Sequence, residues 1–132
     1  MNKKYIHVLV IDDNEDLLHM LKAMFQFTGY DVSIKSDAGA VEEFIHNLSP
    51  DIILMDMLIS GFDARKLCER IKSNPLISSI PLIMISAMPQ ADEQCMASGA
   101  DYFIEKPFEM EHLLNTVEAM TANKVGRKNT IA

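Results

Sequence analysis

The sequence contains few of the residues that build disulfide frameworks or zinc sites. It has two cysteines, Cys68 and Cys95, and four scattered histidines in 132 residues. Two cysteines are too few for the disulfide framework of a small secreted domain. No Cys-x-x-Cys pair or Cys/His cluster has the spacing of zinc ligands. We therefore interpret both cysteines as reduced thiols buried in helices.

Long apolar runs and a basic surface are also missing. The apolar run at 52–55 is far shorter than the roughly 20 residues that span a bilayer, and no charged-then-apolar leader opens the chain. The formal net charge is -7, which argues against broad nucleic-acid binding because that requires a basic face. These features predict a cytoplasmic protein that contacts neither a membrane nor nucleic acid directly.

What the sequence does contain is five repeats of a strand-like segment followed by a helix-like segment. The predicted strands cover 5–11, 31–36, 51–56, 80–86 and 102–106, and the predicted helices cover 13–29, 37–48, 63–73, 90–100 and 109–122. Asp37 is the expected N-cap of the second helix. The expected domain is 1–122, followed by a flexible tail at 123–132.

Alternating strands and helices indicate an α/β fold with a doubly wound parallel sheet. The segments 5–11, 51–56 and 80–86 are continuously apolar, as expected for strands covered on both faces. The segment 31–36 alternates apolar and polar residues, which favours a position near the sheet edge. Right-handed crossovers then favour the flavodoxin-like (βα)5 strand order 2-1-3-4-5.

Acidic residues end two of the strands predicted to be central. Asp12 and Asp13 follow the first strand, and Asp56 ends the third. In the 2-1-3-4-5 order these two strands flank the point where ligands bind in open parallel sheets. Three converging carboxylates repel one another and resist leaving water, and a hard divalent cation removes that cost. The pattern predicts a Mg²⁺ site.

Two further polar residues stand at strand ends. Ser86 ends the fourth strand, and Lys106 ends the fifth. A carboxylate nucleophile, a metal, a hydroxyl and an ammonium could together surround a phosphoryl group. Each residue has an ordinary structural explanation as a helix cap, a turn hydroxyl or a solvated charge. The combination of five such groups at four strand ends is what indicates phosphoryl chemistry.

The sequence resembles the receiver domains of two-component response regulators, including stand-alone receivers. The resemblance covers about the first 120 residues and rests on "VLVIDDNED", "DIILMD", "IMISA" and "GADYFIEKPF" and on their spacing. It also implies the strand order 2-1-3-4-5.

The resemblance implies a role for each acidic residue. Asp56 would be the phosphoacceptor, attacking the phosphohistidine of a sensor histidine kinase or a histidine phosphotransfer protein. Asp13 would bind Mg²⁺ directly, and Asp12 largely through water. The backbone carbonyl of Leu58 would be a further metal ligand. The module would not be an enzyme beyond assisting its own phosphorylation and dephosphorylation, and its downstream protein partner is unknown.

The resemblance also implies roles for residues after the fourth and fifth strands. The Ser86 hydroxyl would bind a phosphoryl oxygen, and Lys106 would pair with the phosphate. Phe103 corresponds to the family's switch aromatic, without the hydroxyl of the commoner tyrosine. The bond between Lys106 and Pro107 matches one that the family often keeps cis.

The chain departs from the family after the acceptor aspartate, in "DMLISGFDA". Ser60 replaces a common proline, and Ala64 replaces a glycine. The loop after the third strand is therefore expected to be looser, since proline would have restricted it. The phosphoryl chemistry does not depend on either side chain.

Three alternatives have specific objections. A haloacid-dehalogenase-like phosphatase needs Asp-x-Asp, but position 58 is leucine. A flavin-binding flavodoxin-like protein needs a Ser/Thr-rich phosphate loop, where "DDNED" would repel phosphate. A non-phosphorylated receiver scaffold would be expected to lack an acid or the lysine, and none is missing. No output domain is recognisable, so the chain is either a stand-alone receiver or part of a longer protein.

Overall fold

The central sheet consists of five parallel strands, as the sequence predicts. The computed structural model describes the backbone of residues 6–131 and the side chains of residues 6–124. The sheet strands are β1 (His7–Ile11), β2 (Asp31–Lys35), β3 (Ile52–Asp56), β6 (Leu82–Ser86) and β7 (Tyr102–Glu105). The helices are α1 (Glu15–Phe27), α2 (Val41–Leu48), α3 (Ala64–Ser73), α4 (Asp92–Ala97) and α5 (Met110–Ile131).

The strand order is β2-β1-β3-β6-β7, and every neighbouring pair in this sheet is parallel. Counted within the sheet, this is the predicted order 2-1-3-4-5. The three continuously apolar strands are central and almost fully buried, whereas β2 lies at an edge and is half-buried. The flavodoxin-like fold prediction is confirmed.

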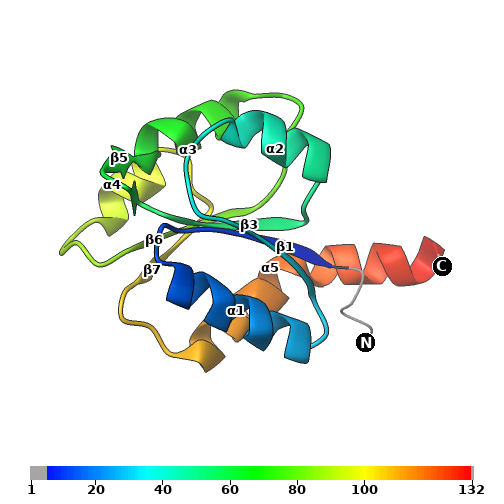
Figure 1. The fold of residues 1–132 in the computed structure, drawn as a ribbon. Helices are drawn as coiled ribbons and strands as arrows, with labels where there is room; N and C mark the ends of the chain where they lie inside the picture. The colour runs from blue at the N-terminus through cyan, green and yellow to red at the C-terminus, as the bar shows by residue number, and fades with distance from the viewer. Residues whose placement is uncertain (1–5, 132) are drawn as a thin grey trace.

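Helices cover both faces of the sheet and bury two separate cores. Helices α1 and α5 lie on one face, and α2, α3 and α4 lie on the other (Figure 1). Leu18, Leu21 and Phe25 of α1 share a core with residues of α5. Cys68 of α3 and Cys95 of α4 lie in the opposite core, where both are free thiols with no exposed area. The prediction of two reduced, buried cysteines is confirmed.

A two-stranded hairpin follows β3 and was not predicted from the sequence. Strands β4 (Leu58–Ile59) and β5 (Phe62–Asp63) pair antiparallel around a turn at Ser60 and Gly61. Both turn residues have positive φ, 50° and 80°, as a tight two-residue hairpin turn requires. The segment closes on itself through paired strands, and the expectation of a looser loop than one with proline stays a prediction.

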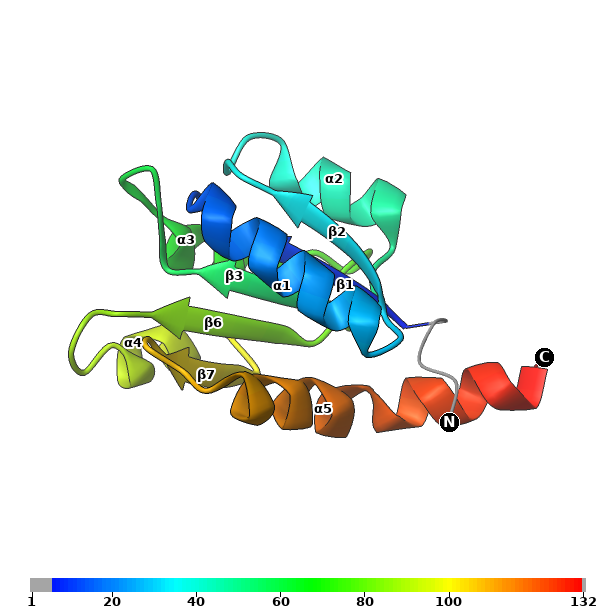
Figure 2. The same cartoon turned by 60° about the horizontal axis from the view of Figure 1, so that its bottom comes forward.

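Two predictions about helix ends need correction. Helix α2 begins only at Val41 after Ala40, which provides no side-chain cap. Asp37 instead accepts a hydrogen bond from the Gly39 backbone N–H at 2.8 Å, so it closes a turn before the helix. Helix α5 continues to Ile131, so residue 122 is not the end of a helix and residues 123–131 are helical. In Figure 2 this helix extends well beyond the sheet.

Candidate functional site

The predicted site residues meet at the carboxyl end of the sheet. Asp12 follows β1, and Asp56 is the last residue of the neighbouring strand β3. Ser86 ends β6, which pairs with β3, and Lys106 follows β7 at the sheet edge. Because parallel strands end at the same side of the sheet, side chains distant in sequence are brought into one crevice.

The three predicted acidic ligands form one cluster. Asp12, Asp13 and Asp56 each offer a carboxylate oxygen, and these oxygens all lie within 4.8 Å of one another. Asp12 is buried, Asp56 is half-buried and Asp13 is exposed. The cluster provides hard oxygen ligands and opens to solvent on one side, and this suits a Mg²⁺ ion that retains water molecules. The residues present therefore fit the predicted metal.

Lys106 lies beside two of the three acids. Its Nζ donates a hydrogen bond to Asp12 Oδ2 at 2.8 Å and lies 3.5 Å from Asp56 Oδ1. The Lys106–Pro107 peptide bond is cis, as the family resemblance implies. Burial alone would lower the pKa of Lys106, but the Asp12 hydrogen bond and the Asp56 charge outweigh it and raise this pKa.

The ionisation of Asp56 is perturbed by its surroundings. Burial raises the pKa of Asp56 to about 6, the Lys106 ammonium opposes the rise, and Asp12 and Asp13 add to it by repulsion. The protonated form of Asp56 is thus favoured in the metal-free protein relative to an ordinary aspartate. A cation beside it would favour the ionised form, which is also the nucleophilic form.

The two predicted switch residues, Ser86 and Phe103, lie on the β6–β7 side of the crevice. Ser86 is 2% exposed, and its Oγ accepts a hydrogen bond from the Met88 backbone N–H at 3.0 Å, while its own O–H can donate to a further acceptor. Phe103, on β7, is partly buried against the core beneath α2, α3 and α4. It also lines a hollow of about 430 Å³ with Met88, Glu105 and His112.

The hairpin reaches the acidic cluster through the backbone. The Ser60 N–H donates a hydrogen bond to Asp13 Oδ2 at 2.7 Å. Sequence reasoning identified Ser60 only as a replacement for proline and missed this contact. The signal was nevertheless present, because proline has no backbone N–H and any other residue at position 60 supplies one. The role of the Leu58 carbonyl as a metal ligand remains a prediction.

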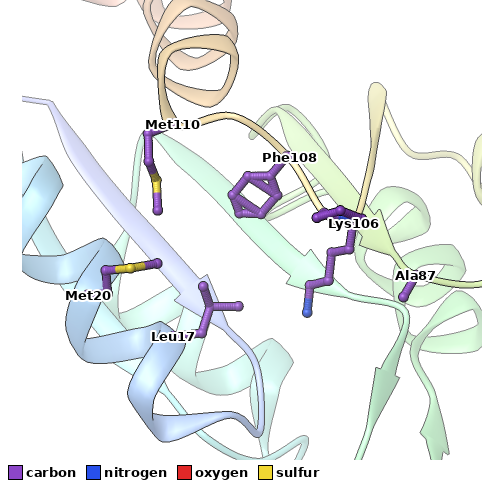
Figure 3. A pocket seen from close by; sticks show the side chains of 7 residues that line it. Leu17, Met20, Ala87, Lys106, Phe108 and Met110 are labelled. Atoms are coloured by element: carbon purple, nitrogen blue, oxygen red, sulfur yellow. The ribbon is translucent and has the colours of Figure 1, made fainter.

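An apolar pocket adjoins the crevice between α1 and the start of α5. The pocket has a volume of about 330 Å³, and the aliphatic stem of Lys106 forms one of its walls (Figure 3). Leu17 and Met20 approach from α1, Phe108 approaches from the segment before α5, and Met110 is the first residue of α5. Sequence reasoning did not predict this pocket, because its residues come from two elements that only the fold brings together.

Comparisons with known proteins decide the family. The model of the response regulator receiver domain matches residues 8–118. The chain belongs to this family. It is 29% identical to the DNA-binding dual master transcriptional regulator RpaA of Synechocystis over 115 residues, which cover 86% of this chain and 48% of RpaA. The chain thus spans about half the length of the curated relatives it matches.

Solved receiver domains have the same fold. The receiver domain of NtrX from Brucella abortus is 26% identical, with a TM-score of 0.77, and the match covers 86% of this chain and 96% of that domain. The receiver domain of sensor histidine kinase PA1611 from Pseudomonas aeruginosa has a TM-score of 0.80 at 23% identity, covering 89% and 98%. That structure has a magnesium ion coordinated in its active-site cleft.

Membership of the family establishes the general class of function. Receiver domains are phosphoacceptor signalling modules of two-component systems, and the acidic cluster of this chain is the feature that receivers use for Mg²⁺. Among the residues that the structure describes, no helix is both long enough and apolar enough to cross a membrane.

Proposed function

We propose that this receiver domain accepts a phosphoryl group on Asp56 in a Mg²⁺-dependent reaction. The donor would be the phosphohistidine of a sensor histidine kinase or of a histidine phosphotransfer protein. The observation that carries the proposal is the convergence of three carboxylates within 4.8 Å, with the Lys106 ammonium bonded to one of them and 3.5 Å from Asp56. The magnesium site of the PA1611 receiver domain also supports it.

Asp56 is the best placed of the three acids to act as the nucleophile. It ends the central strand β3, whereas Asp12 is held by Lys106 and by the Asn14 backbone N–H at 2.9 Å. Asp13 is held by the Ser60 N–H. Asp56 Oδ would attack phosphorus, the bond from phosphorus to the donor imidazole nitrogen would break, and an acyl phosphate would form on Asp56.

The remaining residues would stabilise the transferred group. Mg²⁺, bound by Asp12, Asp13, Asp56 and the Leu58 carbonyl, would neutralise charge on the phosphoryl oxygens. Lys106 would exchange its contact with Asp56 for one with a phosphoryl oxygen, and Ser86 would donate its O–H to another. No side chain needs to act as a general acid, because the leaving imidazole is a stable neutral molecule once protonated by solvent.

Signalling would follow from movement of Ser86 toward the phosphoryl group. Such movement would leave space beneath Phe103, which lies on the strand next to β6 and lines the hollow described above. The surface formed by α4, β7 and α5 would thereby change for a downstream protein. We further propose that residues 1–122 form the receiver domain and that the protein acts in the cytoplasm without contacting DNA or membrane directly.

The phosphoacceptor assignment is tested by incubating the protein with acetyl phosphate and measuring its intact mass. We expect one added phosphoryl group with Mg²⁺ present and none after EDTA treatment. Asp56→Asn should accept none, whereas Asp92→Asn, which removes an exposed carboxylate at the start of α4, should behave as the wild type. Full phosphorylation of the Asp56→Asn variant would exclude Asp56 as the acceptor.

A further inference from the structure

The β4–β5 hairpin contacts the acidic cluster at its turn and leads into helix α3 at its base. At its turn, the Ser60 N–H donates to Asp13 at 2.7 Å. At its base, Leu58 pairs with Asp63, and the Ala64 N–H donates to the Met57 carbonyl at 2.8 Å. Because both turn residues have positive φ, the hairpin is a defined unit rather than a loose loop. The paired strands place the base and the turn of the hairpin in one continuous hydrogen-bonded unit.

Arg65 holds the base of this hairpin. Its Nε donates to Asp63 Oδ1 at 2.9 Å and to Oδ2 at 3.1 Å, and its terminal nitrogen lies 2.5 Å from Oδ2. The Arg65 backbone N–H donates to the same Oδ1 at 3.0 Å, where Asp63 caps α3. A planar guanidinium that meets a carboxylate with a fork of donors fixes orientation in a way that a single ammonium cannot.

The same guanidinium also reaches across to α4. Its other terminal nitrogen donates to the Gln94 side-chain carbonyl. A groove of about 330 Å³ lies between α3 and α4 here and is lined by Arg65, Gln94 and Ser98 among others. The Arg65–Gln94 bond spans this groove. Arg65 thus contacts two elements. One is the hairpin, whose turn binds Asp13, and the other is α4, which belongs to the proposed output surface.

We propose that Arg65 is a positioning residue that braces the β4–β5 hairpin against α4 and so couples Mg²⁺ binding at the acidic cluster to the position of α4. The inference rests on the proposed function, because it requires metal binding by Asp13 and by the Leu58 carbonyl. Both of these groups are attached to the hairpin, one by a hydrogen bond and one by the chain itself. If Arg65 holds the hairpin in place, these two groups lose less conformational freedom when Mg²⁺ binds, and the metal affinity is higher.

The coupling must act in both directions. If Arg65 lowers the cost of ordering the hairpin for the metal, metal binding must also strengthen the contact between Arg65 and α4 by the same free energy. This route leaves from the metal side of the crevice, through α3. It therefore starts from other residues than the route through Ser86 and Phe103, although both routes reach α4, whose first residue Asp92 lines the same hollow as Phe103.

The test is a Mg²⁺ titration of the full chain followed by backbone amide NMR shifts, which report affinity and local response together. Arg65→Met should weaken Mg²⁺ binding by about twofold or more and abolish the Mg²⁺-dependent shifts of residues 92–97. Arg65→Lys, which keeps the charge but loses the fork, should retain part of both. Gln94→Leu should abolish the α4 response while the hairpin still responds. Arg70→Met, which breaks a surface pair between α3 and Glu42, is the matched control.

Each alternative outcome has a separate meaning. Wild-type affinity and a wild-type α4 response in Arg65→Met would overturn the role of Arg65, and so would an equal loss in the Arg70→Met control. A wild type that binds Mg²⁺ without any shift in residues 92–97 would exclude the coupling but leave the metal site intact. A wild type that binds no Mg²⁺ at all would overturn the proposed function and the coupling together.

Discussion

Replacing Asp56 with asparagine should stabilise the metal-free protein at pH 8. The pKa of Asp56 is raised from 3.8 to about 6, with burial as the largest cause. The folded protein therefore binds this proton more tightly than the unfolded chain, and protonated Asp56 favours folding. That contribution is complete below about pH 4 and is lost as pH rises through about 6. Asparagine is neutral at every pH, so the variant avoids the loss.

The structure sets the size of the effect. The difference between 3.8 and about 6 corresponds to about 3 kcal/mol of folding free energy. The Asp56 side chain is 13% exposed, so solvent screens this term only in part. The attraction between Asp56 and Lys106 is already included in this shift, because Lys106 lowers the pKa of Asp56. We therefore expect a net gain of about 1 to 3 kcal/mol at pH 8 and a much smaller difference at pH 4.

Urea denaturation with EDTA present, followed by circular dichroism at pH 4 and pH 8, measures this difference. Saturating Mg²⁺ should reverse the ranking at pH 8, because only the wild type gains the full stabilisation from a ligand that binds the native state. Asp31→Asn, an exposed carboxylate at the opposite end of the sheet, is the control. Equal stability of wild type and Asp56→Asn at pH 8, or a gain that is the same at pH 4, would refute the reasoning.

Three other predictions concern the rim of the crevice and the core. The side chains of Leu58 and Met88 are 42% and 47% exposed and cannot hold a water molecule by hydrogen bonding. Leu58→Asn combined with Met88→Glu should therefore speed the loss of phosphate several-fold in single-turnover decay. Equal decay rates would show that these side chains do not control dephosphorylation. Gly99→Ala should cost about 1 to 2 kcal/mol in urea denaturation, because φ is 104° and the new Cβ would lie 3.1 Å from Lys72; unchanged stability would contradict it. Burial raises the pKa of Cys95 to about 11, so its thiol should resist alkylation at pH 8 until urea unfolds the protein, and rapid labelling of native protein would count against this.

The sheet and its crevice could be predicted because the signals were strong and local. Continuously apolar segments identified the central strands, and the alternating segment identified the edge strand. The acids that end these strands then had to meet at one side of a parallel sheet. Residues at such strand ends lie close together in the fold, so the grouping of Asp12, Asp13 and Asp56 could be predicted from the sequence.

Other features depend on contacts that no local pattern encodes. Strands β4 and β5 have only two residues each, too few for an alternating pattern to be recognised. Asp37 has the right residue type for a helix cap, but the local turn at Gly39 takes its hydrogen bond instead. The Arg65–Gln94 bond joins residues 29 positions apart and requires the packing of α3 beside α4. These interactions follow from tertiary structure rather than from periodicity.

The most direct test of the central claim is to locate the phosphoryl group within the chain. Protein treated with acetyl phosphate and Mg²⁺ is reduced with borohydride, which converts an aspartyl phosphate to homoserine, and the digested protein is analysed by tandem mass spectrometry. The proposed function predicts homoserine at position 56 in the wild type and at no other aspartate. Homoserine at position 12 or 13 instead, with an unmodified Asp56, would contradict it.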